Sequence, residues 1–447
     1  MAIRLTRRDS MILGAGALAG TALGGPVGLR AQIPAADVAP PDLPIEDGAS
    51  LTLLRPTKFV ATDEEIWLAN TKKFTEATGV PVKVEFEGWE DVPTKTAVAA
   101  NVGSGPDVVI GFADNPFLYK DKLHDLSDIT SYLGKKYGGW WPLAERYGVD
   151  PDTGKWIAMP VGASGGRIVY RKSMLEAAGF SEVPGDVDGF LEMAKALQAN
   201  GTPMGLAVGN APGDGNAWTH WLVWSHGGKV ADDDSKLIID SPETVAALEY
   251  GKKLYETFIP GTLSWLDANN NKAFLAQEIS LTQNGISVYY AAKTSEDPAI
   301  KALAEDIFHA RMPVGPVGIP TERCLVFNSM IFDYTPYPNA AKAYLTFMME
   351  SPQYGEWLEK GIGYFNHPLQ AYDASPVWTN DPKHEAYKHV MKDAVWDGYS
   401  GRLGPESAAT LADFIIVQMV ASVCSGQATP EEAAAEAQRR ASRYYRS

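Results

Sequence analysis

The sequence predicts an α/β fold with more than one domain. Short β-branched runs alternate with amphipathic helical segments, which is the pattern of a doubly wound parallel sheet. The chain has 447 residues, and chains of more than about 300 residues usually divide into domains because a single core stops growing. We find no internal repeat, heptad pattern or long low-complexity tract that would indicate another architecture.

The alternation begins at residue 49. Strands are predicted at 49–55, 80–89 and 106–112, and helices at 62–79 and 91–105. Thr62 is expected to cap the first helix, with Glu65 at the capping-box position and Gly79 as the stop. Strand, helix, strand, helix and strand in this order predict β–α–β units.

A G-x-S-x-G pattern occurs at Gly162–Gly166 and raises the possibility of a hydrolase nucleophile at Ser164. A nucleophile elbow requires a strand before the serine and a helix directly after it. Residues 155–161 predict a strand, but residues 167–171 predict a second strand, and a helix begins only at Lys172. A strand, a glycine-rich crossing and another strand indicate a hinge. A secreted serine hydrolase that uses Ser164 with a downstream histidine is the competing hypothesis.

The N-terminus has the features of a twin-arginine export signal. Arg7 and Arg8 precede a weakly apolar stretch of Ala, Gly and Leu, and a cleavage site follows at Ala31. We expect the twin-arginine translocase to export the chain to the periplasm and residues 1–31 to be removed. Residues 32–48 are rich in proline and acids and are expected to form a flexible leader.

The mature chain is strongly acidic. Loss of residues 1–31 removes four arginines and one aspartate, so the formal net charge changes from −16 to −19. This balance suits an exported soluble protein and argues against nucleic acid as a partner. No further apolar stretch is expected to reach the length of about 18 residues that a membrane span needs. Cys324 and Cys424 are expected to be separate buried side chains, although an oxidising compartment permits a disulfide bond.

Polar and aromatic side chains follow the predicted strands at their carboxyl ends, where open α/β sheets bind ligands. Trp89 follows the second strand, and Asp114 and Asn115 follow the third. Aromatic rings cover the C–H faces of sugars and polyols, while carboxylates and amides bind their hydroxyl groups. This combination of residue types predicts a site for a hydroxylated ligand.

A predicted helix near residue 218 carries three tryptophans at a spacing of three residues. Trp221 and Trp224 are expected in the core. Trp218 lies at the start of the helix beside Asn216 and other polar residues, and we expect it to face a cleft.

Two patterns that resemble metal sites do not meet the requirements of such sites. His384 and His389 lie five residues apart, about 140° around a helix, so they cannot share a zinc ion; a solvated helix face is expected there. Residues 150–156 open like a calcium loop, but the twelfth position is Val161 or Ala163 instead of glutamate. A β-turn is expected there, and no metal or cofactor is expected in the chain.

Four segments, in this order and at this spacing, resemble the extracellular solute-binding proteins of ABC importers, in the family (family 1 type) that includes maltose-binding protein. They are residues 105–129, 154–180, 269–285 and 339–365. The resemblance extends over nearly the whole mature chain.

The resemblance implies two discontinuous α/β lobes joined by a multi-strand hinge, as in periplasmic binding proteins of the type II-like class. The N-terminal lobe would comprise residues 49–162 plus 321–364, and the C-terminal lobe residues 163–320 plus 365–447. The chain would cross between the lobes at 161–166, 319–323 and 363–366.

The resemblance also implies a function. A monomeric binding protein, not an enzyme, would capture a sugar, oligosaccharide or polyol between its lobes and deliver it to the permease subunits of the transporter. The expected ligand contacts are Trp89, Asp114, Asn115, Ser164, Asn216, Trp218, Asn284, Tyr364 and Trp396. An anionic or other small organic solute, held by Arg167 or Arg323, is the alternative; otherwise these arginines are expected to form salt bridges between the lobes.

Overall fold

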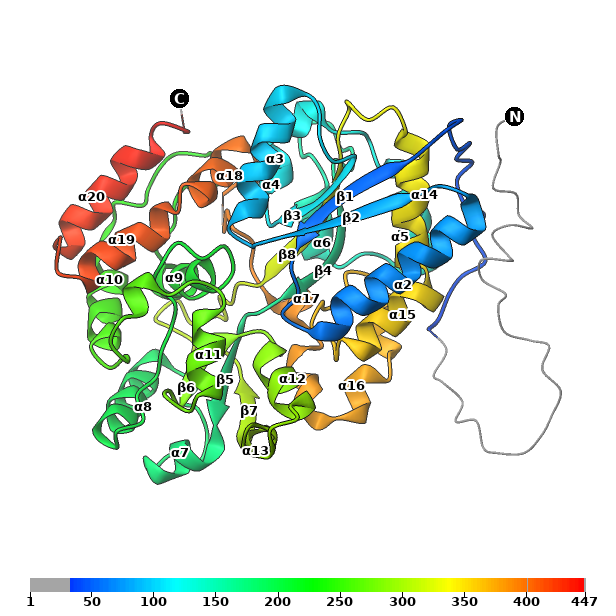
Figure 1. The fold of residues 1–447 in the computed structure, drawn as a ribbon. Helices are drawn as coiled ribbons and strands as arrows, with labels where there is room; N and C mark the ends of the chain where they lie inside the picture. The colour runs from blue at the N-terminus through cyan, green and yellow to red at the C-terminus, as the bar shows by residue number, and fades with distance from the viewer. Residues whose placement is uncertain (1–32, 400, 446–447) are drawn as a thin grey trace. The chain divides into compact units, whose positions relative to one another are not determined.

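The computed structural model describes residues 33–399 and 401–445 and has the predicted α/β fold (Figure 1). The predicted signal peptide lies outside the described residues. The chain divides into two compact units, each described by itself below. Unit 1 comprises the described residues up to Gly111 together with 119–162 and 327–384, and unit 2 comprises 112–118, 163–326 and the chain from residue 385 onward.

The passages of the chain between the units differ from the predicted crossings. The passage at 162/163 lies inside the predicted segment 161–166, whereas the next is at 326/327, after the predicted boundary at residue 320. The passage at 384/385 lies 20 residues beyond the predicted boundary at residue 364. Residues 112–118 belong to unit 2 and not to the first lobe as predicted, which adds two passages.

Unit 1 is built on a five-stranded sheet with the order β2-β1-β3-β8-β4. Its strands are β1 (Leu51–Pro56), β2 (Val82–Glu87), β3 (Val108–Phe112), β4 (Met159–Ser164) and β8 (Leu325–Ile331). β1 pairs in parallel with both β2 and β3. α2 (Ala61–Thr78) and α3 (Asp91–Val102) connect these strands along the chain, so the predicted β–α–β units are confirmed.

The remaining helices of unit 1 come from two distant parts of the chain. They are η1 (Lys120–Lys122), α5 (Ser127–Lys136), α6 (Pro142–Gly148), α14 (Pro338–Met349), α15 (Ser351–Lys360), η3 (Gln370–Ala374), α16 (Val377–Asn380) and η4 (Pro382–Tyr387), the last of which ends in unit 2. α14 and α15 lie against α2 (Figure 1). This contact joins the first and last thirds of the sequence.

The start of α2 differs from the prediction, whereas its end agrees. The helix begins at Ala61, and the Thr62 hydroxyl donates a hydrogen bond to the carbonyl oxygen of Lys360 at 2.8 Å instead of capping the helix. Asp63 in the first turn accepts from Arg55 at 2.6 Å. Gly79 ends the helix with a φ of 77°, in the left-handed region that glycine permits. Contact with a distant helix therefore overrides the local capping pattern.

The predicted flexible leader is wrong for residues 33–48, which pack against the rest of unit 1. Leu43 and Ile45 are buried. The Glu46 carboxylate accepts a hydrogen bond at 2.8 Å from the backbone N–H of Asn339, in the first turn of α14. Buried apolar side chains and a helix cap thus fix a segment whose composition indicated disorder.

Unit 2 contains a three-stranded antiparallel sheet. Its order is β6 (Leu281–Asn284), β5 (Arg167–Arg171) and β7 (Ile307–Ala310). The helices are α4 (Asn115–Leu118), α7 (Lys172–Ala177), α8 (Val187–Ala199), α9 (Asp214–Ser225), α10 (Pro242–Tyr255), η2 (Thr262–Ser264), α11 (Asn269–Leu275), α12 (Ser287–Thr294), α13 (Pro298–Asp306), α17 (Val390–Asp393), α18 (Pro405–Ala412), α19 (Ile415–Cys424) and α20 (Pro430–Ala441).

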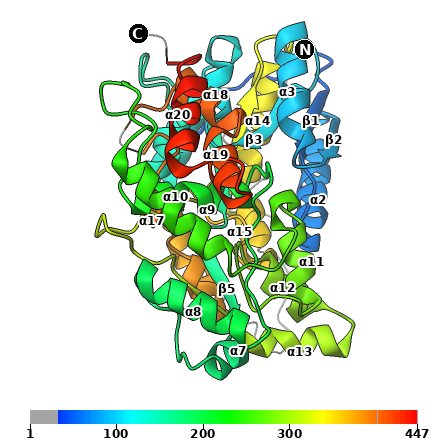
Figure 2. The ribbon, with the colours of Figure 1, turned by 90° about the vertical axis from the view of Figure 1, so that its left-hand side faces the viewer.

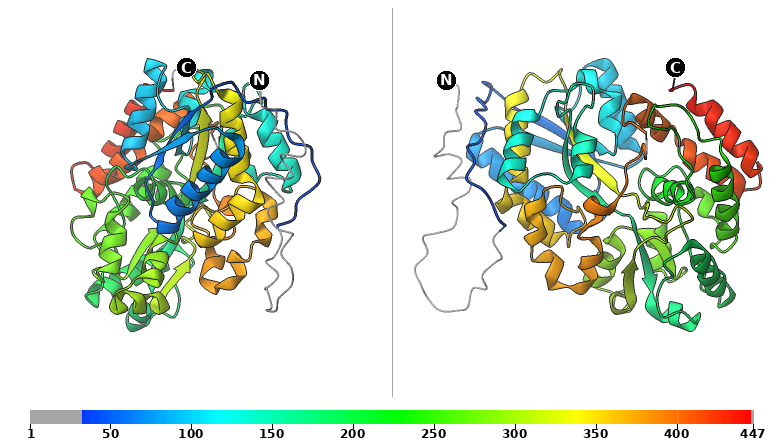
Figure 3. Two further views of the ribbon diagram at one scale, coloured as in Figure 1. Left: turned by 45° about the vertical axis from the view of Figure 1, so that its right-hand side comes forward. Right: turned by 180° about the vertical axis from the view of Figure 1, so that it is seen from behind.

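The core of unit 2 surrounds α9. This helix contacts α10 and α19, and α20 packs on both of those (Figures 2 and 3). Every residue of α9 from Gly215 to Ser225 is buried. α9 is therefore covered by α10 and α19, which come from separate parts of the chain, with α20 packed on both.

One apolar stretch in the described chain corrects the expectation about membrane spans. Residues Pro405–Cys424 have a mean hydropathy of 1.7, which suffices by length and composition for a span. Its residues Ile415, Met419 and Val423 belong to the core of unit 2, so packing within the protein accounts for its composition. Cys324 and Cys424 are both free thiols.

Candidate functional site

The predicted aromatic contacts of unit 1 are packed side chains. Trp89, after β2, is 7% exposed and donates from Nε1 to the carbonyl oxygen of Thr57, just after β1, at 2.8 Å. Its ring meets Phe59 and Phe327 edge to face. Tyr364 is also buried. Trp89 therefore links the carboxyl ends of β1 and β2, and the carboxyl ends of the strands are where open α/β sheets bind ligands.

Asp114 and Asn115 form a tight turn after β3. Ala113 adopts a φ of 46°, in the left-handed region that non-glycine residues rarely occupy. Its N–H donates to the carbonyl oxygen of Val326 at 2.7 Å. The Asn115 side chain accepts from the N–H of Phe112 at 3.2 Å. Strained backbone of this kind is typical of functional sites, where the surroundings hold it in place.

The Asp114 carboxyl group is fully buried in unit 2. Oδ2 accepts from the Ser407 hydroxyl at 3.2 Å, and Oδ1 has no hydrogen-bond partner. Burial, and then the nearby Asp397 carboxylate, raise the pKa of Asp114 well above the usual aspartate range, although Arg323 acts in the opposite direction. The raised pKa favours the protonated form of Asp114, in which the carboxyl group can donate a hydrogen bond as well as accept one.

A cavity of about 20 Å³ lies beside this acid and is lined in part by His220, Asp397 and Ser407. Burial, and then the charge of Arg323, lower the pKa of His220 to about 4. The imidazole is thus neutral at physiological pH, and its Nδ1 lies 2.7 Å from the carbonyl oxygen of Asn216. The cavity has room for about one water molecule.

The two arginines considered for an anionic ligand are already paired with carboxylates. Arg323 forms a buried ion pair with Asp397, with Nη2 at 3.1 Å from Oδ2. Nη1 of Arg167 lies 2.7 Å from Oε2 of Glu322. All four residues belong to unit 2. The expectation that these arginines bridge the two lobes is therefore wrong.

Trp218 does not face a cleft, which corrects the prediction. It has no exposed surface and belongs to the core of unit 2 with Trp221 and Trp224. Its Nε1 donates to the carbonyl oxygen of Ala207 at 2.5 Å, and its ring meets Phe258 edge to face. The physical reason is that α9 packs against α10 and α19, which places the Trp218 side chain in the core of unit 2.

The predicted amide contacts Asn216 and Asn284 are both buried, but their side chains differ in the hydrogen bonds that they form. Asn216 donates to the carbonyl oxygen of Pro212 at 3.3 Å, whereas its Oδ1 has no partner. The Asn284 amide is held by Asn271, and its Oδ1 accepts from the N–H of Gly285 at 2.6 Å. Asn216 therefore retains an unused acceptor, and Asn284 is fixed by its neighbours.

Ser164 ends β4, and β5 begins at Arg167 after two glycines with φ values of 88° and 82°. The predicted strand–glycine–strand sequence is confirmed, and no helix follows the serine directly. Ser164 is 8% exposed. Within the described chain no hydrogen bond joins its hydroxyl to a histidine. The local geometry is that of a strand crossing and not that of a nucleophile elbow.

Trp396 is the predicted aromatic contact that keeps a larger exposed surface. It lies after α17 and is only partly buried. Nε1 donates to the carbonyl oxygen of Gly401 at 3.2 Å, and the ring meets Tyr399 edge to face. The indole is therefore held in place with part of its surface available.

Sequence reasoning missed a polar group at the start of α9. Asp214 accepts from Asn270 Nδ2 at 2.8 Å, and its backbone N–H donates to the Asp267 carboxylate at 2.7 Å. Burial, and then the charge of Asp267, raise the pKa of Asp214 well above its usual range. The sequence offered a signal, because Asp214 precedes Asn216 in the same polar turn, but the contribution of residues 267–270 depends on tertiary contacts.

The two metal-like patterns form other structures. His384 is buried in the short helix η4, where Nδ1 lies 2.9 Å from the carbonyl oxygen of Val377, so the expected solvated helix face is wrong. Asp150 closes a turn by accepting from the Thr153 hydroxyl at 2.9 Å, and Lys120 pairs with Asp152 at 2.7 Å. Among the described residues no group of three or more His, Cys, Asp or Glu side chains is placed to hold a metal ion.

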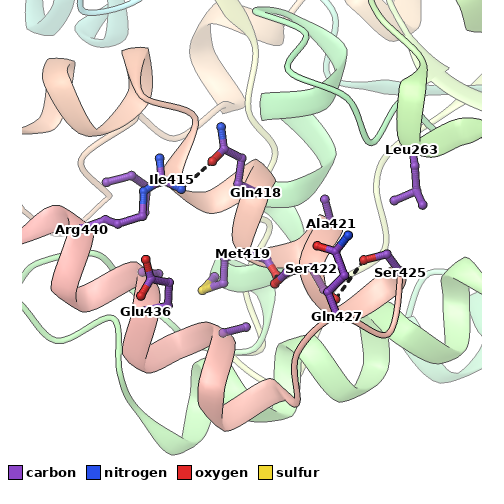
Figure 4. Close-up of a pocket in the computed structure, with 12 residues that line it drawn as sticks. Leu263, Ile415, Gln418, Met419, Ala421, Ser422, Ser425, Gln427, Glu436 and Arg440 are labelled. Atoms are coloured by element: carbon purple, nitrogen blue, oxygen red, sulfur yellow. Dashed lines mark hydrogen bonds between the residues drawn. The ribbon is translucent and has the colours of Figure 1, made fainter.

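A larger hollow of about 430 Å³ lies on α19 and α20 (Figure 4). It is lined by the apolar side chains of Ile415 and Met419 and by Arg440, whose guanidinium donates to Gln418 at 2.5 Å. None of the predicted site residues lines it. It is therefore separate from the residues described above.

Comparisons with known proteins agree with this architecture. The family model of the bacterial extracellular solute-binding proteins matches residues 69–386. The diacetylchitobiose binding protein DasA of Streptomyces coelicolor is 29% identical over 197 residues, which span 42% of this chain and 44% of DasA. YcjN of Escherichia coli, named as an ABC transporter periplasmic-binding protein, is 23% identical over 379 residues, 79% of this chain and 83% of YcjN. The structure of maltose-bound MalE3 of T. maritima has 20% identity and a TM-score of 0.76, covering 88% of this chain and 99% of that chain.

Proposed function

Because the chain belongs to the bacterial extracellular solute-binding protein family, we propose that it is the periplasmic substrate-binding component of an ABC transporter. Its proposed ligand is a sugar, an oligosaccharide or a polyol. The names of DasA and of maltose-bound MalE3 support a carbohydrate. The ligand would pass to the permease subunits of the transporter.

The proposed ligand class rests on which polar groups of unit 2 have hydrogen-bond or ion-pair partners and which do not. Two buried oxygens among the described residues, Asp114 Oδ1 and Asn216 Oδ1, have no hydrogen-bond partner. Arg167 and Arg323 already face carboxylates. Buried polar atoms without partners favour a ligand with hydroxyl groups, which can both donate and accept hydrogen bonds. An anionic ligand would have to compete with carboxylates for both arginines. Neutral polyhydroxylated molecules meet this requirement best.

The cellular part of the proposal depends on the N-terminal motif. The chain would be exported by the twin-arginine translocase, cleaved near Ala31 and released into the periplasm as a monomer. Ligand that contacts both lobes in a closed form and chiefly one in an open form would shift the population toward the closed form. The permease would then distinguish loaded from empty protein by shape.

A thermal-shift screen of the mature chain tests the ligand class. Glucose, maltose, ribitol and mannitol form one set, and glucuronate, which differs from glucose by a carboxylate at one position, is the matched control. A ligand at about 100 times its Kd stabilises the folded state by about 2.7 kcal/mol. We expect members of the neutral set to raise the melting temperature and glucuronate to have no effect. Stabilisation by sugar acids or amines alone would contradict the proposal.

The family consists of binding proteins, and we propose that this chain has no enzyme activity. The competing hypothesis of a serine hydrolase predicts turnover of an activated ester that is lost in Ser164→Ala. We expect no turnover above background from wild type, because the crossing after β4 does not form a nucleophile elbow. Ester hydrolysis that disappears in Ser164→Ala would reverse this conclusion.

A further inference from the structure

The chain enters unit 2 twice and leaves it once near one group of charged side chains, called the entry cluster below. It consists of Arg167, Arg311, Glu322 and Asp393. Arg167 follows the passage at 162/163, Glu322 precedes the passage at 326/327, and Asp393 lies in the segment that begins at residue 385. The cluster thus connects both ends of segment 163–326 with the segment that begins at residue 385, close to the points where the chain passes into or out of unit 2.

Glu322 is the centre of the entry cluster. Its side chain is 1% exposed, and Oε2 accepts from Arg167 Nη1 at 2.7 Å and from Arg311 Nε at 2.9 Å. Oε1 accepts from the N–H of Met312 at 2.9 Å. Asp393 Oδ2 lies 3.3 Å from Arg311 Nη1 and 3.6 Å from Arg167 Nη2. Two cations balance two carboxylates, so loss of one member leaves a buried charge uncompensated.

Proposed ligand contacts lie next to chain positions that the entry cluster holds. Asn284 is paired with Arg167 in the register of β5 and β6. Trp396 directly follows Val395, whose N–H donates to the carbonyl oxygen of Glu322 at 2.9 Å. The positions of the Asn284 amide and of the Trp396 ring are therefore both connected to the entry cluster.

We propose that Arg311 and Glu322 are positioning residues for ligand binding, which rests on the proposed function. By joining the two ends of segment 163–326 to the segment that begins at residue 385, they hold Asn284 and Trp396 in the arrangement that receives the ligand. Arg311 is the member of the cluster that can be changed with least disturbance, since its side chain is 48% exposed. Its loss leaves Arg167 as the only arginine paired with Glu322 and removes one of the two arginines that pair with Asp393.

Arg311→Gln tests the proposal, with Arg171→Gln as the matched control. Arg171 lies on β5 and forms an ion pair with Asp306 at 3.0 Å, but it does not belong to the entry cluster. Binding is measured calorimetrically with the neutral sugar or polyol that gives the largest thermal shift with wild type. We expect Arg311→Gln to weaken binding about tenfold or more, Arg171→Gln to change it less than twofold, and Arg311→Lys to recover most of the loss.

Hydrogen exchange provides a measurement that needs no ligand. Backbone amides of residues 393–397, including the N–H of Val395, should exchange at least tenfold faster in Arg311→Gln than in wild type or Arg171→Gln. Equal exchange and equal affinity in Arg311→Gln and Arg171→Gln would overturn the proposal. Failure of every neutral sugar and polyol to bind wild type and Arg171→Gln would instead overturn the proposed function, and the exchange rates would still decide whether the cluster holds this segment.

Discussion

Replacing Trp396 by alanine tests the aromatic part of the proposed site. The ring is fixed by the hydrogen bond from Nε1 to the carbonyl oxygen of Gly401 at 3.2 Å and by its contact with Tyr399, while part of its surface stays exposed. A fixed, partly exposed ring can stack on the C–H face of a sugar without reorganising. We therefore expect Trp396 to contribute chiefly to binding and little to folding.

The magnitude follows from the burial of the ring. Removal of an aromatic anchor from a binding site costs about 2 kcal/mol or more, which corresponds to a Kd raised about 30-fold. A partly exposed residue outside the core costs about 1 kcal/mol of folding stability when it is truncated. Trp396→Ala should thus show a large change in affinity and a small change in the free energy of unfolding.

Trp218→Ala is the control with the opposite expectation. Its side chain has no exposed surface and donates to the carbonyl oxygen of Ala207. Truncation of a buried tryptophan costs about 3–5 kcal/mol of folding stability, and the unpaired carbonyl adds about 1–3 kcal/mol. Below its melting temperature this variant should bind ligand with an affinity close to that of wild type.

Urea unfolding followed by circular dichroism gives the stabilities, and calorimetry with the sugar or polyol from the thermal-shift screen gives the affinities. The reasoning is refuted if Trp396→Ala binds like wild type, or if Trp218→Ala loses affinity while its unfolding midpoint is unchanged. The second result would place Trp218 at the ligand.

Three further predictions concern single side chains. Asp114→Asn should reduce the loss of stability that wild type shows as the pH rises above about 4. An acid whose pKa is raised in the folded state stabilises the fold fully below its unfolded pKa, and this contribution is lost as the pH rises through the folded pKa. Urea melts at several pH values measure this dependence. His220→Gln should lessen the loss of stability as pH falls from about 6.5 to 4, because the folded pKa of His220 is lowered to about 4; an unchanged acid limb in the same melts would contradict the assignment. Glu46→Ala should cost about 1 kcal/mol by removing the cap of α14, whereas Glu65→Ala, which changes an exposed glutamate on α2, should leave the melting temperature unchanged.

The fold was predictable where local pattern decides the structure. The strand after Gly166 was identified from its β-branched and aromatic residues and is β5. The end of α2 was identified from Gly79, because the left-handed conformation there favours glycine over other residues. In both cases the information lies within a few neighbouring residues.

The candidate site was less predictable because tertiary contacts decide which side chains are accessible. The helix that carries Trp218 was identified, but no pattern within it shows that α10 and α19 cover its sides. The pairing of Arg323 with Asp397 joins residues 74 positions apart, and it removes an arginine that the sequence made available to an anionic ligand. The prolines and acids around Leu43 and Ile45 predicted a flexible leader, although both side chains are buried.

The division of unit 2 among 112–118, 163–326 and the chain from residue 385 has a practical consequence. No single uninterrupted fragment encodes either unit, so truncation at any passage leaves both halves with incomplete cores. The fragments 33–162 and 163–326 should accordingly be insoluble when each is expressed alone. Co-expression of complementary fragments, cut at an exposed loop within one unit, is the rational way to obtain a split form that reassembles.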